Sequence, residues 1–187
     1  MKRTGWMLGF ALVLGFPLLV FTASTAQGED EKKPGYIGAL TCAKVCHKTA
    51  KQGKQLSLWQ AAGHANAFAT LATEEAKAIA KEKGIEDPQK SDQCLKCHTT
   101  AHGVASELLG AKFSHEEGVG CEVCHGPGSL YKKRSVMKDR EKSIAAGLLI
   151  PDEKTCLKCH NEESPTYMPF DYEERLAEIA HLKPKAE

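Results

Sequence analysis

The sequence predicts an all-α fold with extensive coil in a single domain, and three observations lead to this expectation. Apolar residues recur at helical spacing in several short stretches, and long alternating runs of β-branched residues are lacking. Sixteen glycines and eight prolines favour loops between those stretches. Eight cysteines form four pairs, and a histidine directly follows each pair. Because aromatic residues make up only 6% of the chain, the domain needs another source of apolar surface for its core.

Three of the cysteine pairs have the pattern Cys-x-x-Cys-His, and the first pair has one additional intervening residue. Two thiols about one helical turn apart can each bond to one vinyl group of a single porphyrin, and the adjacent imidazole then becomes the axial ligand of its iron. The spacing therefore predicts four covalently bound haems c, around which the domain is organised. The attachment residues are Cys42, Cys46, Cys94, Cys97, Cys121, Cys124, Cys156 and Cys159, and the axial ligands are His47, His98, His125 and His160.

Zinc knuckles, a disulfide framework and a thioredoxin-like redox pair are the competing interpretations of the cysteines. Two Cys-x-x-Cys pairs can form a closed four-thiolate zinc site, but the histidine after every pair would then be a coincidence. A disulfide framework also leaves the histidines unexplained. A thioredoxin-like pair needs a βαβ pattern around a single motif, and the sequence shows none. Haem attachment accounts for the cysteines and the histidines together.

The first 26 residues have the pattern of a secretory signal peptide. Lys2 and Arg3 precede an apolar run over residues 6–21, and the small side chain of Ala26 suits cleavage directly after it. The run is short for a bilayer span of about 20 residues, so an uncleaved anchor is less favoured and no membrane span is expected after cleavage. Export agrees with thioether formation outside the cytoplasmic membrane. We therefore expect the protein in the periplasm or beyond it.

Residues 27–39 are polar and read as a disordered lead-in, so the cytochrome domain is expected over residues 40–187. The chain has 25 basic and 24 acidic residues and no basic patch of the kind that follows phosphates, which does not favour nucleic acid as a partner. The basic stretch 132–134 suits contacts with haem propionates or a docking partner, or a solvated face.

The helical stretches lie between the motifs. Helices are predicted over residues 48–60, 67–83 and 135–146, with a short turn at 106–109 and a last helix that Asp171 caps and that delivers His181. Ser135 is the expected cap of the third of these helices. Loops are expected elsewhere, because glycine and proline follow the motifs closely.

Four histidines lie outside the motifs and are candidates for the second axial position of the irons. His64 sits among small residues that let a porphyrin approach the backbone, and His181 is expected at the end of an amphipathic helix. Both suit a distal ligand. His102 follows His98 too closely along the chain to reach the opposite face of that haem easily. His115 lies in a glycine-rich loop, and the sequence leaves its role open.

Several segments together resemble the tetrahaem cytochrome c-554 family. They are Tyr36-Ile37-Gly38 before the first motif, Trp59 with His64-Ala65-Asn66-Ala67, residues 118–128 around the third motif, and the closing segment from Phe170-Asp171 to His181. The resemblance covers most of the chain after the signal. It implies closely packed haems that pass electrons, with every iron but one six-coordinate and the exception on the second motif.

The resemblance also implies partners for two of the free histidines. Carried over to this chain, His64 would bind the haem of His125, and His181 would bind the haem of His160. The haem of His98 would then lack a second protein ligand.

The first motif departs from the family pattern. For the haem of His47 the family uses a histidine shortly after the third motif, where this sequence has Ser135. Met137 is the nearby candidate, and a methionine ligand would raise the potential of that haem relative to neighbours with two histidines. An ordinary core methionine is the alternative interpretation of Met137. His102 and His115 are further candidates for the same position.

These features predict an exported electron carrier that accepts electrons from one redox partner protein and delivers them to another. One alternative is a reductase of a small nitrogen or sulfur oxide at an open haem, with His102 as proton donor. The sequence has no Cys-x-x-Cys-Lys motif and no other catalytic constellation, so no catalytic residue is assigned and a carrier is favoured over an enzyme. A second alternative is a subunit of an extracellular haem filament. The donor, the acceptor, the potentials and the oligomeric state are not predicted.

Overall fold

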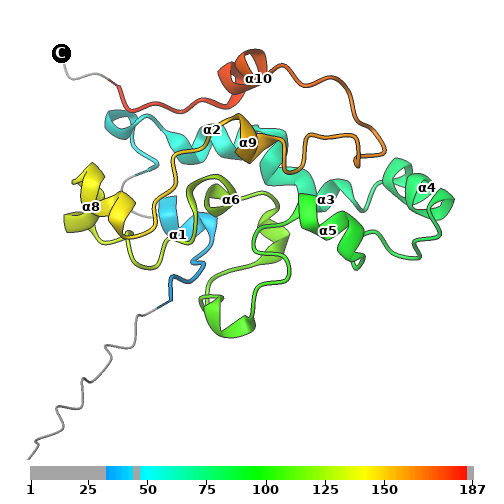
Figure 1. The fold of residues 1–187 in the computed structure, drawn as a ribbon, viewed down its shortest axis with the longest axis horizontal. Coiled ribbons are helices and arrows are strands. Elements are labelled where there is room, and N and C mark those ends of the chain that lie inside the picture. The colour runs from blue at the N-terminus through cyan, green and yellow to red at the C-terminus, as the bar shows by residue number, and fades with distance from the viewer. Residues whose placement is uncertain (1–32, 44–46, 185–187) are drawn as a thin grey trace, which may run out of the picture. The chain divides into compact units, whose positions relative to one another are not determined.

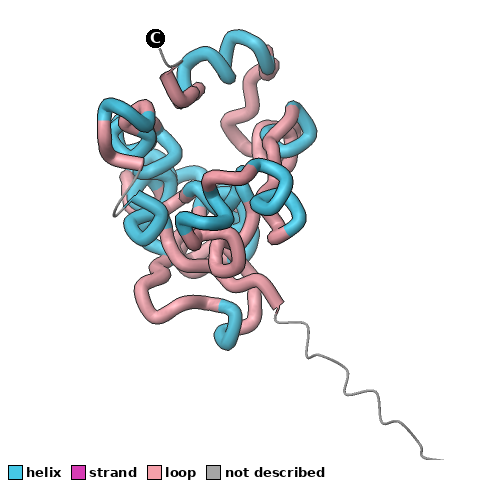
Figure 2. Tube along the Cα trace, turned by 90° about the vertical axis from the view of Figure 1, so that its left-hand side faces the viewer, coloured by secondary structure: helices cyan, strands magenta, loops and turns pink. Residues whose placement is uncertain are grey.

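The computed structural model describes residues 33–43 and 47–184, which form one unit of short helices joined by long loops (Figure 1). The expected signal peptide, residues 27–32 of the expected lead-in, and Cys46 lie outside the described residues. Within the described ranges no strand occurs, and an isolated bridge joins Tyr36 to Leu109. Figure 2 shows the helices as short segments separated by loops. The all-α class with extensive coil is confirmed for this part of the chain.

The first half of the domain is built from five short helices. They are α1 (Ala39–Ala43), α2 (Gln55–Ala61), α3 (Ala67–Thr70), α4 (Glu74–Glu82) and α5 (Asp92–His98), with 3-10 turns η1 (Ala50–Gln52) and η2 (Gly63–Asn66). The single helix predicted over residues 67–83 is therefore wrong. It is broken because the Thr73 hydroxyl accepts a hydrogen bond from the backbone N–H of Ala76 at 3.2 Å and starts α4 as a new helix.

The second half contains five more helices, also short. They are α6 (Cys121–His125), α7 (Arg134–Met137), α8 (Arg140–Ala145), α9 (Glu153–Cys156) and α10 (Tyr172–Ile179), with 3-10 turns η3 (Ser106–Leu108) and η4 (His115–Glu117). Asp171 caps α10 as predicted, since its carboxylate accepts from the N–H of Glu174 at 2.9 Å. The helix predicted from Ser135 is instead split, because Asp139 caps α8 by accepting from the N–H of Lys142 at 3.0 Å.

Ordered packing begins before the domain boundary expected at residue 40. The N–H of Gly35 donates to the hydroxyl of Ser129 at 2.7 Å, and the N–H of Ile37 donates to the buried carboxylate of Glu122 at 2.9 Å. Residues 35–39 are thereby held against the segment that contains the third motif. Within the described residues no helix is long and apolar enough to cross a membrane.

The buried apolar core is small for a domain of this length. Its members are Ile37, Ala39, Ala43, Leu71, Ala80 and Tyr131. Large apolar side chains are exposed beside the cysteine motifs instead, among them Leu58 at 46% and Leu157 at 40%. Porphyrin faces attached at the motifs would cover such side chains, so the distribution of apolar surface fits a domain that packs around haems.

Candidate haem-binding site

The described motifs lie on helices that bring their cysteines to one face. The third motif forms α6 by itself, and α5 ends at the histidine of the second motif. Side chains three residues apart on a helix are neighbours, as two bonds to one porphyrin require. In the fourth motif α9 ends at Cys156, and the N–H of His160 still donates to its carbonyl at 3.0 Å, so the helical turn continues. The seven described cysteines are all half-buried.

Cysteines of different motifs also lie close together. Cys42 in α1 and Cys121 in α6 lie close enough for each to shift the pKa of the other, and Cys97 in α5 likewise raises the pKa of Cys159. Cys124 is in turn an electrostatic neighbour of Cys156. The motifs are therefore adjacent in the order first, third, fourth and second.

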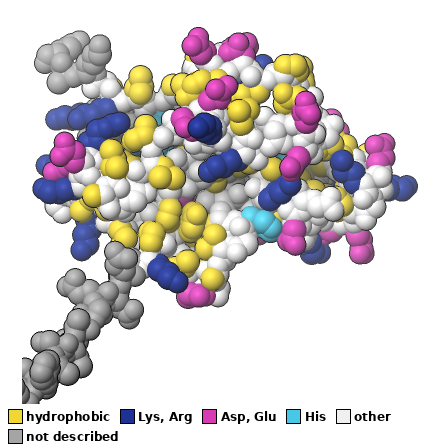
Figure 3. All heavy atoms as spheres, in the orientation of Figure 1, with side chains coloured by type: hydrophobic (Ala, Val, Ile, Leu, Met, Phe, Trp, Pro, Cys, Tyr) yellow, Lys and Arg dark blue, Asp and Glu magenta, His cyan; other side chains and the backbone are white. Residues whose placement is uncertain are grey.

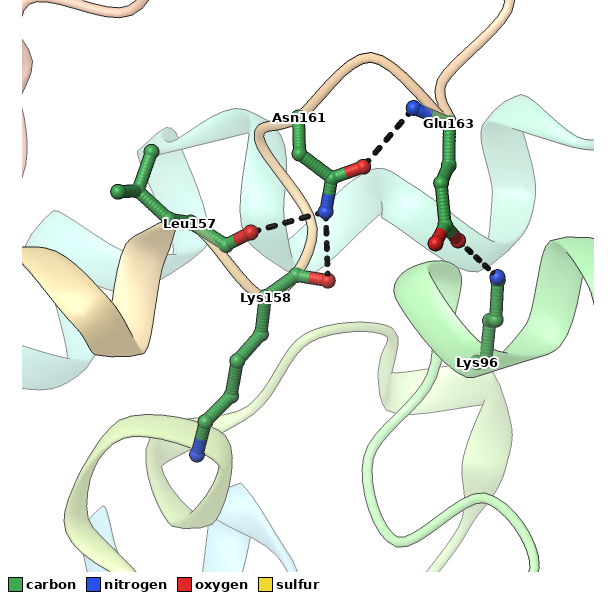
Figure 4. Close-up of polar contacts among 5 residues, drawn as sticks. All are labelled: Lys96, Leu157, Lys158, Asn161 and Glu163. Atoms are coloured by element: carbon green, nitrogen blue, oxygen red, sulfur yellow. Dashed lines mark hydrogen bonds and ion pairs between the residues drawn. The ribbon is translucent and has the colours of Figure 1, made fainter.

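Polar contacts also hold the second motif to the loop after the fourth. Lys96 of α5 forms an ion pair with Glu163, and the side-chain amide of Asn161 donates to the carbonyls of Leu157 and Lys158 (Figure 4). The side-chain oxygen of Asn161 accepts from the N–H of Glu163 at 2.9 Å. These bonds order the loop that follows His160 and keep the fourth motif beside α5.

Burial keeps most of these cysteines as neutral thiols. Loss of hydration raises the pKa of Cys124 and of Cys156, and burial together with the nearby Cys97 raises the pKa of Cys159 to about 12. Cys121 is an exception, because the neighbouring Cys42 lowers its pKa. The thiolate is the form that binds zinc and attacks disulfides. In the described part of the chain, no group of three or more His, Cys, Asp or Glu side chains has the geometry of a metal site.

Two pairs of histidine rings lie close together with their planes at a steep angle. The rings of His64 and His160 have centroids 6.1 Å apart at 78°, and those of His125 and His181 have centroids 6.0 Å apart at 73°. A metal–imidazole nitrogen bond is about 2 Å long and the ring centre lies about 1 Å further out, so two imidazoles on opposite sides of one iron have centroids about 6 Å apart. Both separations fit two axial ligands of one haem iron.

The facing pairs correct the pairing that the family resemblance implied. His64 was expected opposite His125, and His181 opposite His160. The structure instead places His64 opposite His160 and His181 opposite His125. The physical reason is that α10 runs back along the domain, so that the chain after Ile179 returns to the third motif. Gln55 of α2 lies there as well, with its amide nitrogen 3.5 Å from the carbonyl oxygen of His181.

The protonation state of these histidines also suits metal binding. Burial lowers the pKa of His64, His125 and His160, which favours the neutral imidazole that ligates metals. The Nδ1 atom of His125 donates to the carbonyl of Leu149 at 3.2 Å, and that of His181 donates to the carbonyl of Ile179 at 2.8 Å. A backbone bond at Nδ1 leaves Nε2 as the ligating atom.

One cavity lies beside the third motif and is lined by residues from several elements. It is lined by Trp59, His64, Val119, Cys121, Cys124, His125 and His181, among others. The indole nitrogen of Trp59 donates to the carbonyl of Val119 at 2.9 Å and fixes this wall. The residues present therefore fit a covalently bound haem c, with attachment thiols and axial imidazoles on one cavity.

The second motif has a different surrounding. Nδ1 of His98 donates to the carbonyl of Ala67 at 2.7 Å, but no other histidine ring faces His98 among the described residues. His102 points its Nε2 toward Asp92 at 3.4 Å. His115 donates from Nδ1 to the carbonyl of Thr100 at 2.9 Å. His102 and His115 line a second cavity beside α5, and their roles stay open.

The first motif is described only in part. His47 contacts the side chain of Gln55, and burial lowers the pKa of its imidazole. Met137 ends α7 and is half-buried, and no described contact joins it to His47. A methionine ligand for this haem stays a prediction.

A buried carboxylate beside the cysteines was not anticipated. Glu122 lies within the third motif, is 3% exposed, and accepts hydrogen bonds from the N–H groups of Ile37, Gly38 and Gly128 at 2.7–2.9 Å. Burial raises its pKa, while these three donors oppose that shift. Its position between two cysteines was the available signal, but its partners lie up to 85 residues away in sequence. Glu122 thus fastens the entry segment to the third motif.

Comparison with known proteins gives two matches. The family model described as "Cytochrome c554 and c-prime" matches residues 41–126. Cytochrome c-554 of Nitrosomonas europaea is 29% identical over 156 residues, which is 75% of this chain and 63% of that protein. The chain thus spans less than two thirds of this relative's length. No solved structure matches. Together with the motif geometry described above, these matches support the expected resemblance to the cytochrome c-554 family.

Proposed function

We propose that the chain is an exported tetrahaem cytochrome that accepts electrons from one redox partner and passes them to another. The observation that carries this proposal is the pair of facing histidines at two motifs, His64 with His160 and His125 with His181. A bound haem c supplies one-electron exchange between ferric and ferrous iron. Two imidazoles at one iron leave no position for a substrate, so these two motifs are suited to electron transfer.

The contacts between motifs support a continuous path for the electron. Neighbouring attachment thiols, such as Cys42 with Cys121 and Cys97 with Cys159, would bring the edges of their porphyrins close together. The neighbouring Cys124 and Cys156 join these two halves. The proposed path therefore runs through the first, third, fourth and second motifs, with one end at His47 and the other at His98.

The chain's own residues would set the properties of each haem. Backbone carbonyls at Nδ1 orient His98, His125 and His181, and such bonds make the imidazole a stronger donor to the metal. At the first motif we propose Met137 as second ligand of the haem of His47. The signal pattern supports a location outside the cytoplasmic membrane, where haem is attached.

The test is the purified protein from a host that can mature c-type cytochromes. We expect a mass that exceeds the cleaved polypeptide by four haems, and reversible reduction of all of them in a redox titration. Replacing Cys156 and Cys159 by serine should remove one haem and leave the others. A protein without bound haem, or one whose haems cannot be reduced reversibly, would overturn the proposal.

A second candidate function has one specific observation in its favour. No described histidine faces His98, and the cavity with His102 and His115 lies beside the same helix. This arrangement favours a reductase of a small nitrogen or sulfur oxide at the second motif, with His102 as proton donor. Electron paramagnetic resonance separates the two candidates when it is combined with turnover assays. A high-spin iron with turnover of nitrite or nitric oxide supports the reductase, and wholly low-spin iron excludes it.

A further inference from the structure

Lys and Arg side chains gather on one side of the molecule, although the described chain is electrically balanced. Residues 33–43 and 47–184 contain twenty basic and twenty acidic side chains. Ten of the basic ones lie in the segments 48–54, 132–142 and 181–184, which hold only two acidic side chains. Figure 3 shows this gathering as dark-blue side chains over α8 and the loop before α2, on the left. The remaining described chain carries the compensating acidic excess.

The three segments meet around one pair of histidines. Gly53 lies so close to the carbonyl oxygen of Leu182 that a Cβ on the glycine would be 2.6 Å from it, so the loop 48–54 packs on the chain after α10. His181 in that chain faces His125. His125 in turn donates to the carbonyl of Leu149, which lies in the loop after α8. The basic segments thus surround the haem site of the third motif.

Most positive charges of these segments have no carboxylate partner among the described residues. Lys142 forms an ion pair with Asp139 at 3.0 Å, and the other nine basic side chains have no ion-pair partner among the described residues. Elsewhere Lys77, Lys90, Lys96 and Arg175 are all paired. A surface with unpaired charges of one sign attracts a partner of opposite sign and raises the rate of encounter.

Exposed apolar side chains lie beside these charges. Ile144 at the end of α8 is 45% exposed, and Ile150 is 51% exposed. An apolar centre with a charged rim is the usual composition of a protein–protein interface. A site that bound only small anions would not require exposed apolar side chains such as these two isoleucines.

We propose that segments 48–54, 132–142 and 181–184, together with Ile144 and Ile150, form the docking surface for an acidic face of a redox-partner protein. We name this the basic face. It would bring the partner next to the haem of His125. The inference rests on the proposed function of electron carrier and adds where, and to what kind of surface, a partner binds.

The test compares two charge-reversal variants of the haem-loaded protein. One variant carries Lys133→Glu, Arg134→Glu and Lys138→Glu on the basic face. The control carries the same number of reversals at positions that are exposed and unpaired in the described chain but lie outside the basic face, namely Lys81→Glu, Lys83→Glu and Lys112→Glu. All six positions are on the surface, so both variants are expected to fold and to bind their haems.

The probe is flavodoxin, an acidic one-electron donor, in its hydroquinone form. One electron passes from the anionic flavin hydroquinone to a ferric haem, which becomes ferrous, and the flavin becomes the neutral semiquinone without release of a proton. We expect the second-order rate for the wild type to fall steeply with salt. The basic-face variant should react about tenfold more slowly at low ionic strength and lose most of the salt dependence, while the control stays within about twofold. Calorimetric titration with oxidised flavodoxin should show the same ranking of affinity.

The outcomes separate this inference from the function on which it rests. Failure of dithionite to reduce the wild type would overturn the carrier function and the docking surface together. Equal flavodoxin rates for the wild type and the basic-face variant would overturn the docking surface alone. Vesicles of phosphatidylglycerol test the alternative that this surface binds an anionic membrane. Binding of vesicles that the basic-face reversals abolish, with an unchanged flavodoxin rate, would assign the surface to membranes and overturn the proposal.

Discussion

The imidazole ring of His64 lies edge to face with that of His160, with 6.1 Å between the ring centroids. The two residues are far apart in sequence, and the pairing depends on the backbone around His64. There the carbonyl of His64 accepts from the N–H of Val119 at 2.9 Å. The segment before the third motif therefore positions the candidate ligand of the fourth.

Replacing His64 by alanine should change the spin state of one haem. If His64 is the second ligand at the fourth motif, its loss leaves that iron with one protein ligand, and one low-spin signal per molecule should become high-spin. The measurement is electron paramagnetic resonance of the oxidised protein. His102→Ala is the matched control, because His102 faces Asp92 and no other histidine ring. Unchanged spectra for His64→Ala would contradict the pairing.

Gly118→Ala should destabilise the protein through the backbone of His64. Gly118 has φ +71°, and a Cβ there would lie 2.7 Å from the carbonyl oxygen of His64. Gly103 has φ +72° with nothing within 4 Å of its Cβ position, so Gly103→Ala measures the cost of a positive φ without a close contact, about 1–2 kcal/mol. Gly118→Ala should cost more in urea denaturation and should also disturb the low-spin signals. Equal effects of the two substitutions would show that the close contact has no consequence.

Glu122→Gln should lower the free energy of unfolding by about 1–3 kcal/mol, because an amide NH₂ would then face backbone N–H donors. Glu116→Gln, at an exposed position, should have little effect. The measurement is urea denaturation followed by circular dichroism.

The effect of Glu122 should also depend on pH. Burial raises the pKa of Glu122 above its ordinary 4.5, so the folded protein binds this proton more tightly than the unfolded chain. The stability of the wild type relative to the glutamine variant should therefore decrease as the pH rises from about 4.5 through the raised folded pKa, and then level off. A relative stability that increases over this range would contradict the direction of the shift.

Met137→Leu tests the proposed ligand of the first motif. A methionine ligand on ferric haem c gives a characteristic absorption band at the red end of the visible spectrum, and leucine cannot replace the sulfur. We expect the band in the wild type and its loss in Met137→Leu. Met168→Leu should retain it, since Met168 is 74% exposed. A band that persists in Met137→Leu would leave Met137 as a packing residue of α7.

The helices that the sequence predicted correctly are those with strong local signals. Asp171 starts α10 because a carboxylate at that position can accept from the N–H three residues later. The predictions over residues 67–83 and 135–146 failed because the apolar stripes continue across Thr73 and Asp139, whose side chains start new helices. Apolar periodicity alone does not show such breaks.

The haem-attachment residues could be predicted because each motif is contiguous in sequence, and their role stays a prediction. The partners of His64 and His181 could not be predicted from the sequence. These pairings depend on how α10 and the loop before the third motif fold back across the domain. The same limit applies to Glu122, because two of its donors, Ile37 and Gly38, lie far from it in sequence. It applies also to the basic face. Its three segments are far apart in a chain with nearly equal numbers of acidic and basic residues.

The thiol contacts between different motifs have a consequence for biogenesis. If the polypeptide became compact before receiving its cofactors, Cys42 would rest against Cys121 and Cys97 against Cys159. An oxidant would then form disulfides between different motifs, and these would block both sites until they were reduced. If haems are attached as proposed, the thiols of these motifs would have to be in the reduced form when each haem is added.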